Sequence, residues 1–416
     1  MKRRVVVTGM GAITPVGNDV ATTWRALLAG ESGSANITKF DASTWPVRFA
    51  CEVKGFDPLL YMDRKEAKRA DWYTQYAVAA SVQAMKQAGL ENGNASVDPD
   101  RIGVIVGSGI GGLKSFEEQH DVYRERGQSK ISPFFIPMFI ADIAAGIVSM
   151  RFGAKGPNYA TVSACATSAH AIGDAYRTIQ YGDADVMITG GSEATVTPMA
   201  IGGFANMKAL SERNDSPATA SRPFDATRDG FVMGEGAGIV ILEELEHARK
   251  RGATIYGEIV GYGATADAYH LTAPAPEGEG AQRAMRRALN DANLGVNDIQ
   301  YINAHGTSTP ANDSNETKAI KAVFGESAKT LHVSSTKSAT GHMLGAAGAV
   351  EFIICTHVVR ECVIPPTINY ETPDPELGGL NFTPNKSAQR DVHAALSNSF
   401  GFGGHNVALA VRRFEG

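Results

Sequence analysis

Short apolar runs alternate with helix-like segments along almost the whole of this 416-residue chain. Several of the strand-like runs are apolar without polar alternation, as in a sheet that is covered on both faces. This alternation predicts α/β layers. We expect strands over residues 4–9, 101–109, 185–191, 236–244, 253–263, 299–306, 332–336 and 393–399. We expect helices over residues 18–29, 74–89, 137–151, 166–180, 279–292, 312–323 and 344–360.

The chain is long enough for two ordinary domains or for one large intertwined domain. We place a boundary near residues 250–253, where a charged helix gives way to a long strand-like run, and divide the chain into 1–252 and 253–416. The segments YATVSAC (159–165) and HAALSNSF (393–400) faintly resemble each other, because both lead from a strand into a turn of small residues. That likeness is too weak to demonstrate an internal repeat.

Composition and charge argue against several classes of protein. Hydrophobic residues make up 43% of the chain, enough for a substantial core. We expect no membrane span and no signal peptide, because apolar runs are short and MKRRVVVTGMG has the pattern of a first strand. The net charge of −5 argues against general nucleic-acid binding. The four cysteines form no CxxC pair, so we expect no metal site, no disulfide framework and a reducing, cytosolic location.

Cys165 lies in NYATVSACATSAHAIG, where a strand-like segment turns into an Ala-rich helical pattern. Apolar residues at every third position from Ala166 to Ala175 form one stripe of that helix. The unpaired amides and the dipole at a helix N-terminus favour a thiolate, the nucleophilic form of cysteine. The same amides can hold an oxyanion after attack on a thioester. The competing interpretation is a small buried cysteine, since free cysteine is among the most buried residue types.

A histidine, His305, follows the strand-like run IQYIN in NAHGTSTPANDSNE. Gly306 lets the chain turn sharply there, and hydroxyls follow at positions 307 to 309. Ligands tend to bind at the carboxyl ends of strands in α/β layers. The alternative is a turn histidine that caps its own loop.

A second histidine, His342, lies in SSTKSATGHMLGAAGAVE, again after a strand-like run. The same segment contains Lys337 and Glu351, which could form a purely structural ion pair. One cysteine with one histidine would suit a thiol hydrolase. Two histidines and a lysine suit a different task, which is to hold a carbonyl group while a carbanion forms.

In this order, SACATSAHAIGDAYR, HGTSTPxxD and STKSxTGHxLGAAGAVE resemble the β-ketoacyl-acyl-carrier-protein synthases. VVVTGMGAITPVGN, ASRPFDATRDGFVMGEGAG and NSFGFGGHN fit as well, so the likeness runs from about residue 3 to residue 413. The pattern most resembles the synthase II branch of dissociated bacterial fatty-acid synthesis. The resemblance implies the thiolase-like fold, with two similar halves in five αβαβα layers, and a homodimer.

The resemblance also implies a mechanism. A Cys–His–His triad carries over onto Cys165, His305 and His342, and the family lysine carries over onto Lys337. An acyl group passes from a carrier-protein phosphopantetheine arm to the cysteine. Malonyl-carrier protein then loses carbon dioxide, and its enolate attacks to give a 3-ketoacyl product two carbons longer. Neutral histidines stabilise the enolate, the amides of Cys165 and Phe402 form the acyl oxyanion hole, and no cofactor is needed beyond the arm that the substrates carry.

Substrate contacts implied by the resemblance are Thr307 and Thr309 for the pantetheine, Phe400 beside the acyl site, Ile110 at the floor of the acyl pocket and Phe402 as a gate. On the residues alone, Ile110 also fits an ordinary core position and Phe402 an aromatic packed beside a Gly turn. GSGIGG (107–112) mimics a dinucleotide fingerprint, but the required βαβ context is missing.

The family's acidic carrier protein implies basic contacts at Lys65, Lys68, Arg69, Lys130 and Lys208. In DRKEAKRAD, i,i+4 spacing predicts that the first three, with Arg64, lie on adjacent faces of one helix. The alternative is a solvated charged face.

Two positions depart from the synthase II pattern. Ser168 replaces a common Gly and is shared with synthase I members, and His405 replaces a common Thr. The rivals are a synthase I-type enzyme, a thiolase, a non-catalytic chain-length partner subunit of a polyketide-type ketosynthase, and a cysteine hydrolase. A thiolase would need a late second cysteine, a partner subunit would be expected to lack the nucleophile, and a hydrolase would leave the second histidine unexplained.

Overall fold

The computed structural model describes residues 2–91 and 97–416 of the chain. Ten strands of these residues form one mixed sheet, in the order β10-β9-β13-β14-β8-β1-β7-β6-β4-β5. Their bounds are β1 (Val5–Ile13), β4 (Ile102–Gly107), β5 (Asn158–Tyr159), β6 (Val186–Glu193), β7 (Gly236–Glu244), β8 (Gly257–Ala266), β9 (Tyr301–Asn303), β10 (His332–Ser334), β13 (Ala394–Gly401) and β14 (His405–Arg412). Two short pairs lie outside it, β2 (Ala35–Asn36) with β3 (Phe49–Ala50) and β11 (Val363–Ile364) with β12 (Ala388–Gln389).

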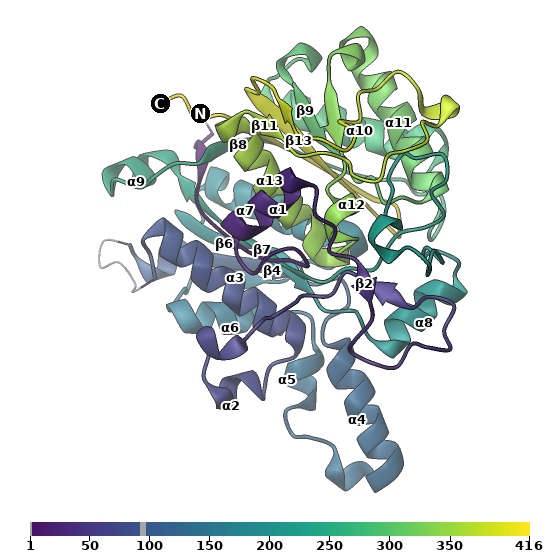
Figure 1. The fold of residues 1–416 in the computed structure, drawn as a ribbon. Helices are drawn as coiled ribbons and strands as arrows, with labels where there is room; N and C mark the ends of the chain where they lie inside the picture. The colour runs from purple at the N-terminus through teal and green to yellow at the C-terminus, as the bar shows by residue number, and fades with distance from the viewer. Residues whose placement is uncertain (1, 92–96) are drawn as a thin grey trace.

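The helices and strands form the five layers expected for the fold (Figure 1). Helices α3 and α6 cover the N-terminal strands, α10 and α11 cover the C-terminal strands on the opposite side, and α7 and α13 lie between. The helix bounds are α1 (Val20–Ala29), α2 (Arg64–Ala67), α3 (Trp72–Ala88), α4 (Leu113–Arg126), α5 (Phe135–Phe139), α6 (Ile143–Phe152), α7 (Thr167–Tyr181), α8 (Pro198–Asn206), α9 (Leu245–Lys250), α10 (Glu279–Ala292), α11 (Pro310–Phe324), α12 (Lys337–Thr340) and α13 (Ala347–Glu361).

The two halves of the chain repeat one arrangement. Outward from the middle of the sheet, the N-terminal strands run β1-β7-β6-β4-β5 and the C-terminal strands run β8-β14-β13-β9-β10. In each half the first two pairings are antiparallel and the last two are parallel. The halves join where β1 pairs with β8 at Val5 to Val7.

The repeat is real, but the two segments that suggested it are not equivalent. HAALSNSF belongs to β13, which occupies the place of β6 in the other half. YATVSAC instead leads from β5 to α7, as the segment after β10 leads to α13. The likeness came from small residues at strand ends, and small residues are needed wherever chains approach closely.

Other expectations hold with shifted boundaries. The helix expected over 137–151 is two helices, α5 and α6, because Ile140 has an extended backbone with ψ of 136°. Strand β14 was not expected, although it pairs with both β13 and β8. The boundary that we placed near residues 250–253 falls between α9 and β8.

Helix α13 is buried on all sides from Ala347 to Val359, because it lies between two layers of strands. This central position lets the helix carry a charged residue, Glu351, into the interior next to the candidate site. Within residues 2–91 and 97–416, no helix has the length and apolar character of a membrane span.

Candidate active site

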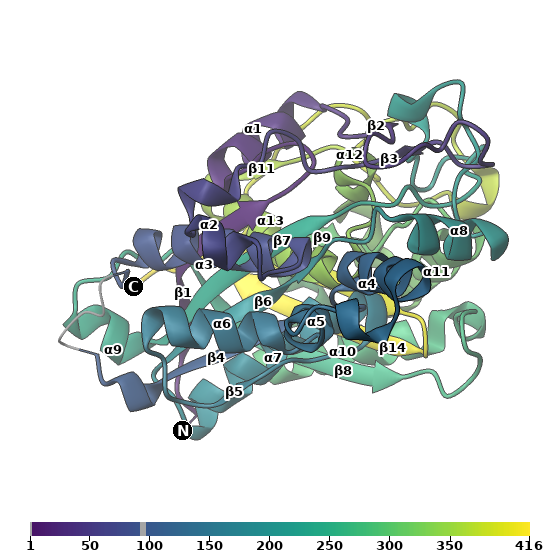
Figure 2. The ribbon, with the colours of Figure 1, turned by 90° about the horizontal axis from the view of Figure 1, so that it is seen from below.

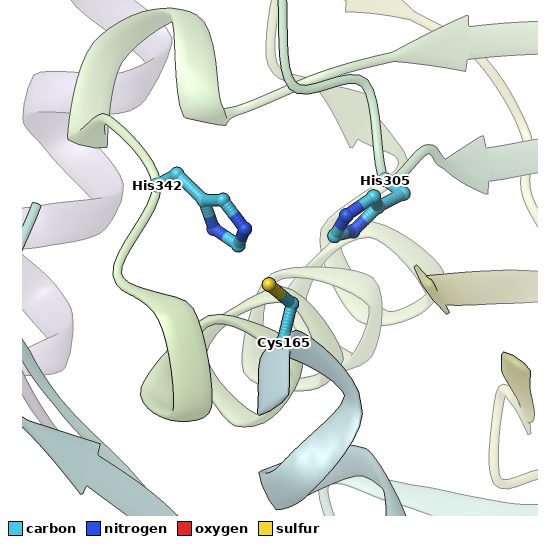
Figure 3. Close-up of side chains that lie close together, drawn as sticks. All are labelled: Cys165, His305 and His342. Atoms are coloured by element: carbon cyan, nitrogen blue, oxygen red, sulfur yellow. The ribbon is translucent and has the colours of Figure 1, made fainter. Parts of the chain in front are cut away.

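Cys165 lies in a single 3-10 turn, Ala164–Ala166, directly before α7 (Figure 3). Ala164 has φ of 49°, a backbone conformation that a non-glycine residue adopts at a cost. The stripe from Ala166 to Ala175 is fully buried, so α7 is fixed in the middle layer and holds the turn in place. The predicted position of the cysteine at the start of a helix is therefore confirmed.

The expected preference for a thiolate at Cys165 is opposed by burial. Burial raises the pKa of the Cys165 thiol to about 12, although the charge of Lys337 and the amides of Phe402 and Cys165 act in the opposite direction. The helix start therefore does not outweigh the removal of the sulfur from water. The thiol must lose its proton as it attacks, and the two amide N–H groups that face the sulfur can donate hydrogen bonds to an oxygen that becomes negatively charged.

The two predicted histidines lie on either side of the Cys165 sulfur (Figure 3). The sulfur and one ring nitrogen of each histidine lie within 4.8 Å of one another. His305 follows β9, and His342 follows α12, so both come from the C-terminal half. Their rings are nearly perpendicular, at 85°, with centroids 5.2 Å apart.

Both histidines are neutral. Burial lowers the pKa of His305 well below 6.5, and the charge of Lys337 lowers that pKa further. Burial and Lys337 act in the same way on the pKa of His342. Lys337 Nζ lies 3.4 Å from His305 Nδ1. Because an ammonium group can only donate, Nδ1 accepts, and the imidazole proton of His305 is on Nε2.

Lys337 is held by Glu351, whose carboxylate accepts a hydrogen bond from Nζ. Both side chains are buried, at 1% and 3% exposure. Burial raises the pKa of Glu351 to about 7, and Lys337 opposes that rise. The predicted ion pair is present, and it holds the ammonium that sets the tautomer of His305.

We expect a Glu351→Gln variant to lose about 3–5 kcal/mol of unfolding free energy, because it leaves the Lys337 ammonium buried without a counter-charge. A Lys337→Met, Glu351→Leu double variant should lose much less, because it buries no charge. Chemical denaturation of the three proteins measures the difference. Equal stability of the single and double variants would contradict the account.

Two functional carboxylates were missed at the level of sequence. Glu316 on α11 accepts the backbone N–H groups of His305 (2.9 Å) and Gly306 (2.8 Å) and fixes the turn that carries the histidine. Glu193 ends β6 and lines the same cavity as Cys165. The available signals were an acidic residue at the end of a strand with no other charge, VMITGGSE, and an acidic residue in the helix that follows the HGTSTP turn.

The triad opens into a cavity of about 510 Å³. Besides Cys165, His305 and His342, the predicted residues that line it are Ile110, Lys208, Thr307, Thr309, Phe400 and Phe402. Lys337 and Glu351 are not among the lining residues and lie behind His305. The hydroxyls of Thr307 and Thr309 lie 2.9 Å apart, and the latter caps α11.

Phe402 lies in the glycine-rich turn between β13 and β14. Its ring centroid is 6.3 Å from that of Phe204, and the side chain is half-buried at the cavity wall. Gly403 and Gly404 have φ of 85° and 74°, which side chains other than glycine rarely allow. The turn that carries Phe402 therefore depends on glycine at both of these positions.

The predicted basic residues do not form one patch. The expected i,i+4 pairing holds for Arg64 and Lys68, because the Lys68 N–H group donates to the Arg64 carbonyl at the end of the four-residue helix α2. It does not hold for Lys65 and Arg69, because the Arg69 N–H group donates to the Glu66 carbonyl. Lys65, Lys68 and Arg69 are all exposed. Arg69 stacks over Phe134, four residues after the exposed Lys130. Lys208 follows α8, apart from α2 in both ribbon views (Figure 1 and Figure 2).

Comparison with known proteins places this geometry in context. The family model "Beta-ketoacyl synthase, N-terminal domain" matches residues 2–248, and "Beta-ketoacyl synthase, C-terminal domain" matches residues 256–371. The chain is 55% identical over 414 residues to the 3-oxoacyl-[acyl-carrier-protein] synthase 2 of Staphylococcus aureus strain N315, covering 99% of each chain. A β-ketoacyl synthase structure from Burkholderia phymatum is 37% identical, with a TM-score of 0.92 and full coverage of both chains. A type II polyketide ketosynthase in complex with its acyl-carrier protein is 35% identical, with a TM-score of 0.91 and the same coverage.

Proposed function

The chain belongs to the β-ketoacyl synthase family, and from that premise we propose that it is a 3-oxoacyl-[acyl-carrier-protein] synthase II. It elongates a cysteine-bound acyl chain by two carbons, using malonyl-carrier protein, in type II fatty-acid synthesis. The observation that carries the proposal is the meeting of Cys165 with two neutral histidines in one cavity. A non-catalytic partner subunit is disfavoured because the nucleophile is present.

Acyl transfer begins with attack of the Cys165 sulfur on the thioester carbonyl of an acyl-carrier protein. The carbonyl oxygen takes up negative charge, and the amides of Cys165 and Phe402 are placed to donate to it, since both face the sulfur. Collapse breaks the bond to the phosphopantetheine sulfur, which leaves with the thiol proton. The result is an acyl-enzyme and a free carrier arm.

Condensation uses the two histidines. The thioester oxygen of malonyl-carrier protein is held by N–H donors of His305 and His342, and breaking the bond to the carboxylate releases carbon dioxide. The electron pair of that bond forms an enolate, which the two donors stabilise. The enolate carbon attacks the acyl carbonyl, the bond to Cys165 breaks, and the cysteine sulfur regains a proton.

Lys337 positions His305 for this step. Its ammonium occupies Nδ1, so Nε2 carries the proton that the enolate needs. The reaction requires no bound cofactor, because the phosphopantetheine arrives with the substrates. The cytosolic location expected above stays a prediction.

The proposal is tested by incubating the protein with a long-chain acyl-carrier protein, measuring intact mass and mapping the modified peptide. We expect an acyl group on Cys165 and, after addition of malonyl-carrier protein, release of a ketoacyl product two carbons longer. Acylation without extension would favour a transferase or a partner subunit. If the mass does not increase with any of a range of acyl donors, Cys165 is a buried core residue and not the nucleophile.

We propose that an acidic carrier protein binds the exposed basic residues near α2, while Lys208 lies beside the cavity that receives the arm. Reversal of Lys65, Lys68 and Arg69 to Glu should raise the KM for acyl-carrier protein at least about tenfold with little change in kcat, because such charges act mainly on encounter. Steady-state kinetics at low and high salt measures this effect. Lys318→Glu, on α11 across the molecule, is the matched control (Figure 1). Unchanged KM values would identify the α2 group as a solvated face.

We propose that two copies of the chain pair along β5. This strand ends the sheet, both of its residues are exposed, and Val162 and Met150 nearby are exposed apolar residues (Figure 2). An exposed sheet edge with apolar neighbours is a ready surface for pairing. Sedimentation should show a dimer for the wild type and a monomer for Val162→Glu; a monomeric wild type would exclude this interface.

A further inference from the structure

The internal repeat places Gly345 where the other half has the nucleophile. A 3-10 turn precedes α13 at Leu344–Ala346, as Ala164–Ala166 precedes α7, and Gly345 and Cys165 are the middle residues. Leu344 has φ of 45°, close to the 49° of Ala164. The amide of Gly345 thus corresponds to the cysteine amide that faces the sulfur in the first half.

That amide already has a partner within the protein, the side-chain carboxyl group of Glu193. Glu193 is fully buried, and its Oε2 accepts the N–H groups of Gly345 (3.0 Å) and Gly109 (2.9 Å). Its Oε1 accepts the Ser108 hydroxyl (2.9 Å) and the Ile110 N–H group (3.2 Å). Four donors surround one carboxylate. Burial raises the pKa of Glu193 to about 7, and these four hydrogen bonds oppose that rise, so the side chain is ionised above that pH.

The carboxylate joins two segments that serve the proposed reaction. One is the turn after β4, which carries Ile110 into the cavity. The other is the loop between His342 and α13, in which Gly345 is the middle residue of the 3-10 turn. The segments touch, because a Cβ on Gly345 would lie 2.5 Å from the Gly109 nitrogen. Among the described residues, the amides of Gly345, Gly109 and Ile110 have no acceptor other than Glu193.

We propose that Glu193 is a positioning residue that sets acyl-chain selection by fixing the Ile110 turn against the His342 loop. The inference rests on the proposed function, since it assigns the residue to the acyl pocket of that reaction. The carboxylate also places a negative charge beside the nucleophile: it raises the pKa of the Cys165 thiol. A clamp with a purely structural role would alter stability without altering selectivity.

A Glu193→Gln variant separates a role in acyl-chain selection from a purely structural role. A side-chain amide has one acceptor oxygen, so it cannot satisfy all three backbone N–H groups. The NH₂ group of the glutamine can donate to the Ser108 hydroxyl, which is able to accept. It would face the Ile110 N–H group as donor against donor, so that amide would lose its acceptor. The Ile110 turn therefore loosens, and the part of the cavity wall that Ile110 forms yields to longer chains. Glu193→Asp keeps the charge but has a shorter reach.

The experiment compares kcat/KM for short and long saturated acyl-carrier proteins, and the rate of Cys165 alkylation by iodoacetamide against pH. In both variants the long-to-short ratio should rise at least about tenfold, equivalent to about 1.4 kcal/mol. The alkylation profile should move to lower pH in Glu193→Gln, which loses the anion, and stay in place in Glu193→Asp. Glu235→Gln, at a buried carboxylate paired with Lys39, is the matched control and should change neither readout.

The outcomes are distinguishable from failure of the proposed function. Wild-type protein that neither acylates nor condenses would refute that function, and the alkylation profiles would still report whether Glu193 acts on Cys165. If the wild type condenses and both folded variants keep its chain-length ratio, the positioning role is overturned. An unshifted alkylation profile in Glu193→Gln would overturn the assignment of an anion to this site.

Discussion

A Cys165→Ala variant is expected to form no acyl-enzyme and to lose condensation, yet to keep the decarboxylation of malonyl-carrier protein. Removal of the nucleophile from a cooperating catalytic set typically costs about 10⁶-fold in rate. Decarboxylation needs no thiol, because the enolate oxygen is held by His305 and His342. Both histidines are fixed by contacts of their own: the Glu316 carboxylate accepts the His305 N–H group, and the Val232 carbonyl accepts the His342 N–H group at 2.7 Å.

Intact mass spectrometry measures the acyl adduct, and release of carbon dioxide measures decarboxylation. Cys362→Ala is the matched control, because this cysteine is partly exposed and lies outside the cavity. An adduct that persists in Cys165→Ala would assign the nucleophile to another side chain. Loss of decarboxylation in a folded Cys165→Ala protein would show that the sulfur takes part in both steps.

The three residues of the triad were named from the sequence because each lies in a short, distinctive motif, after β5 for Cys165, after β9 for His305 and after α12 for His342. The local pattern left a buried cysteine and a loop-capping histidine open as alternatives, and the resemblance of the motifs to a known family selected the triad. Their meeting depends on the repeat, which brings the start of α7 and the ends of β9 and α12 together around the middle layer.

The supporting carboxylates could not be predicted in this way. Glu193 and Glu316 act on amides that are distant along the chain, and the need for an acceptor exists only once those amides are buried. The effect of burial on the pKa of the Cys165 thiol could not be predicted for the same reason. The local pattern shows a helix start, whereas the loss of hydration depends on layers supplied by the other half.

The basic residues show a further limit. Charge spacing in DRKEAKRAD predicted two i,i+4 pairs on one helix, but α2 ends after four residues, so a helical hydrogen bond joins Arg64 and Lys68 and none joins Lys65 and Arg69. A capping box between Asp63 and Glu66 stabilises this short helix, so the acidic residues of the segment serve the backbone. Lys65, Lys68 and Arg69 are exposed, so a partner can reach them. The turn that follows α2 sets the positions of Lys68 and Arg69.

His305→Ala and His342→Ala are each expected to lower decarboxylation about 10²–10³-fold, as for removal of one oxyanion donor. Acyl transfer to Cys165 should be reduced far less, because its oxyanion is held by backbone amides. The double variant should fall by less than the product of the single effects, since both donors serve one oxygen. His332→Ala is the control, because this histidine lies on β10 outside the cavity. Retained decarboxylation in either triad variant would contradict the assignment.

The pH dependence tests the same two side chains in the wild type. Because the pKa values of both histidines lie well below 6.5, they stay neutral as the pH falls from 8 to 6.5. The decarboxylation rate should therefore stay flat over that range and decline only at lower pH. Protonation of His305 would place a proton on Nδ1 against the Lys337 ammonium, so the acid form is opposed by like charge. A rate of carbon dioxide release that halves near pH 6.5, and is insensitive to pH in His305→Ala, would show that His305 titrates as an exposed histidine does and that burial does not hold it neutral.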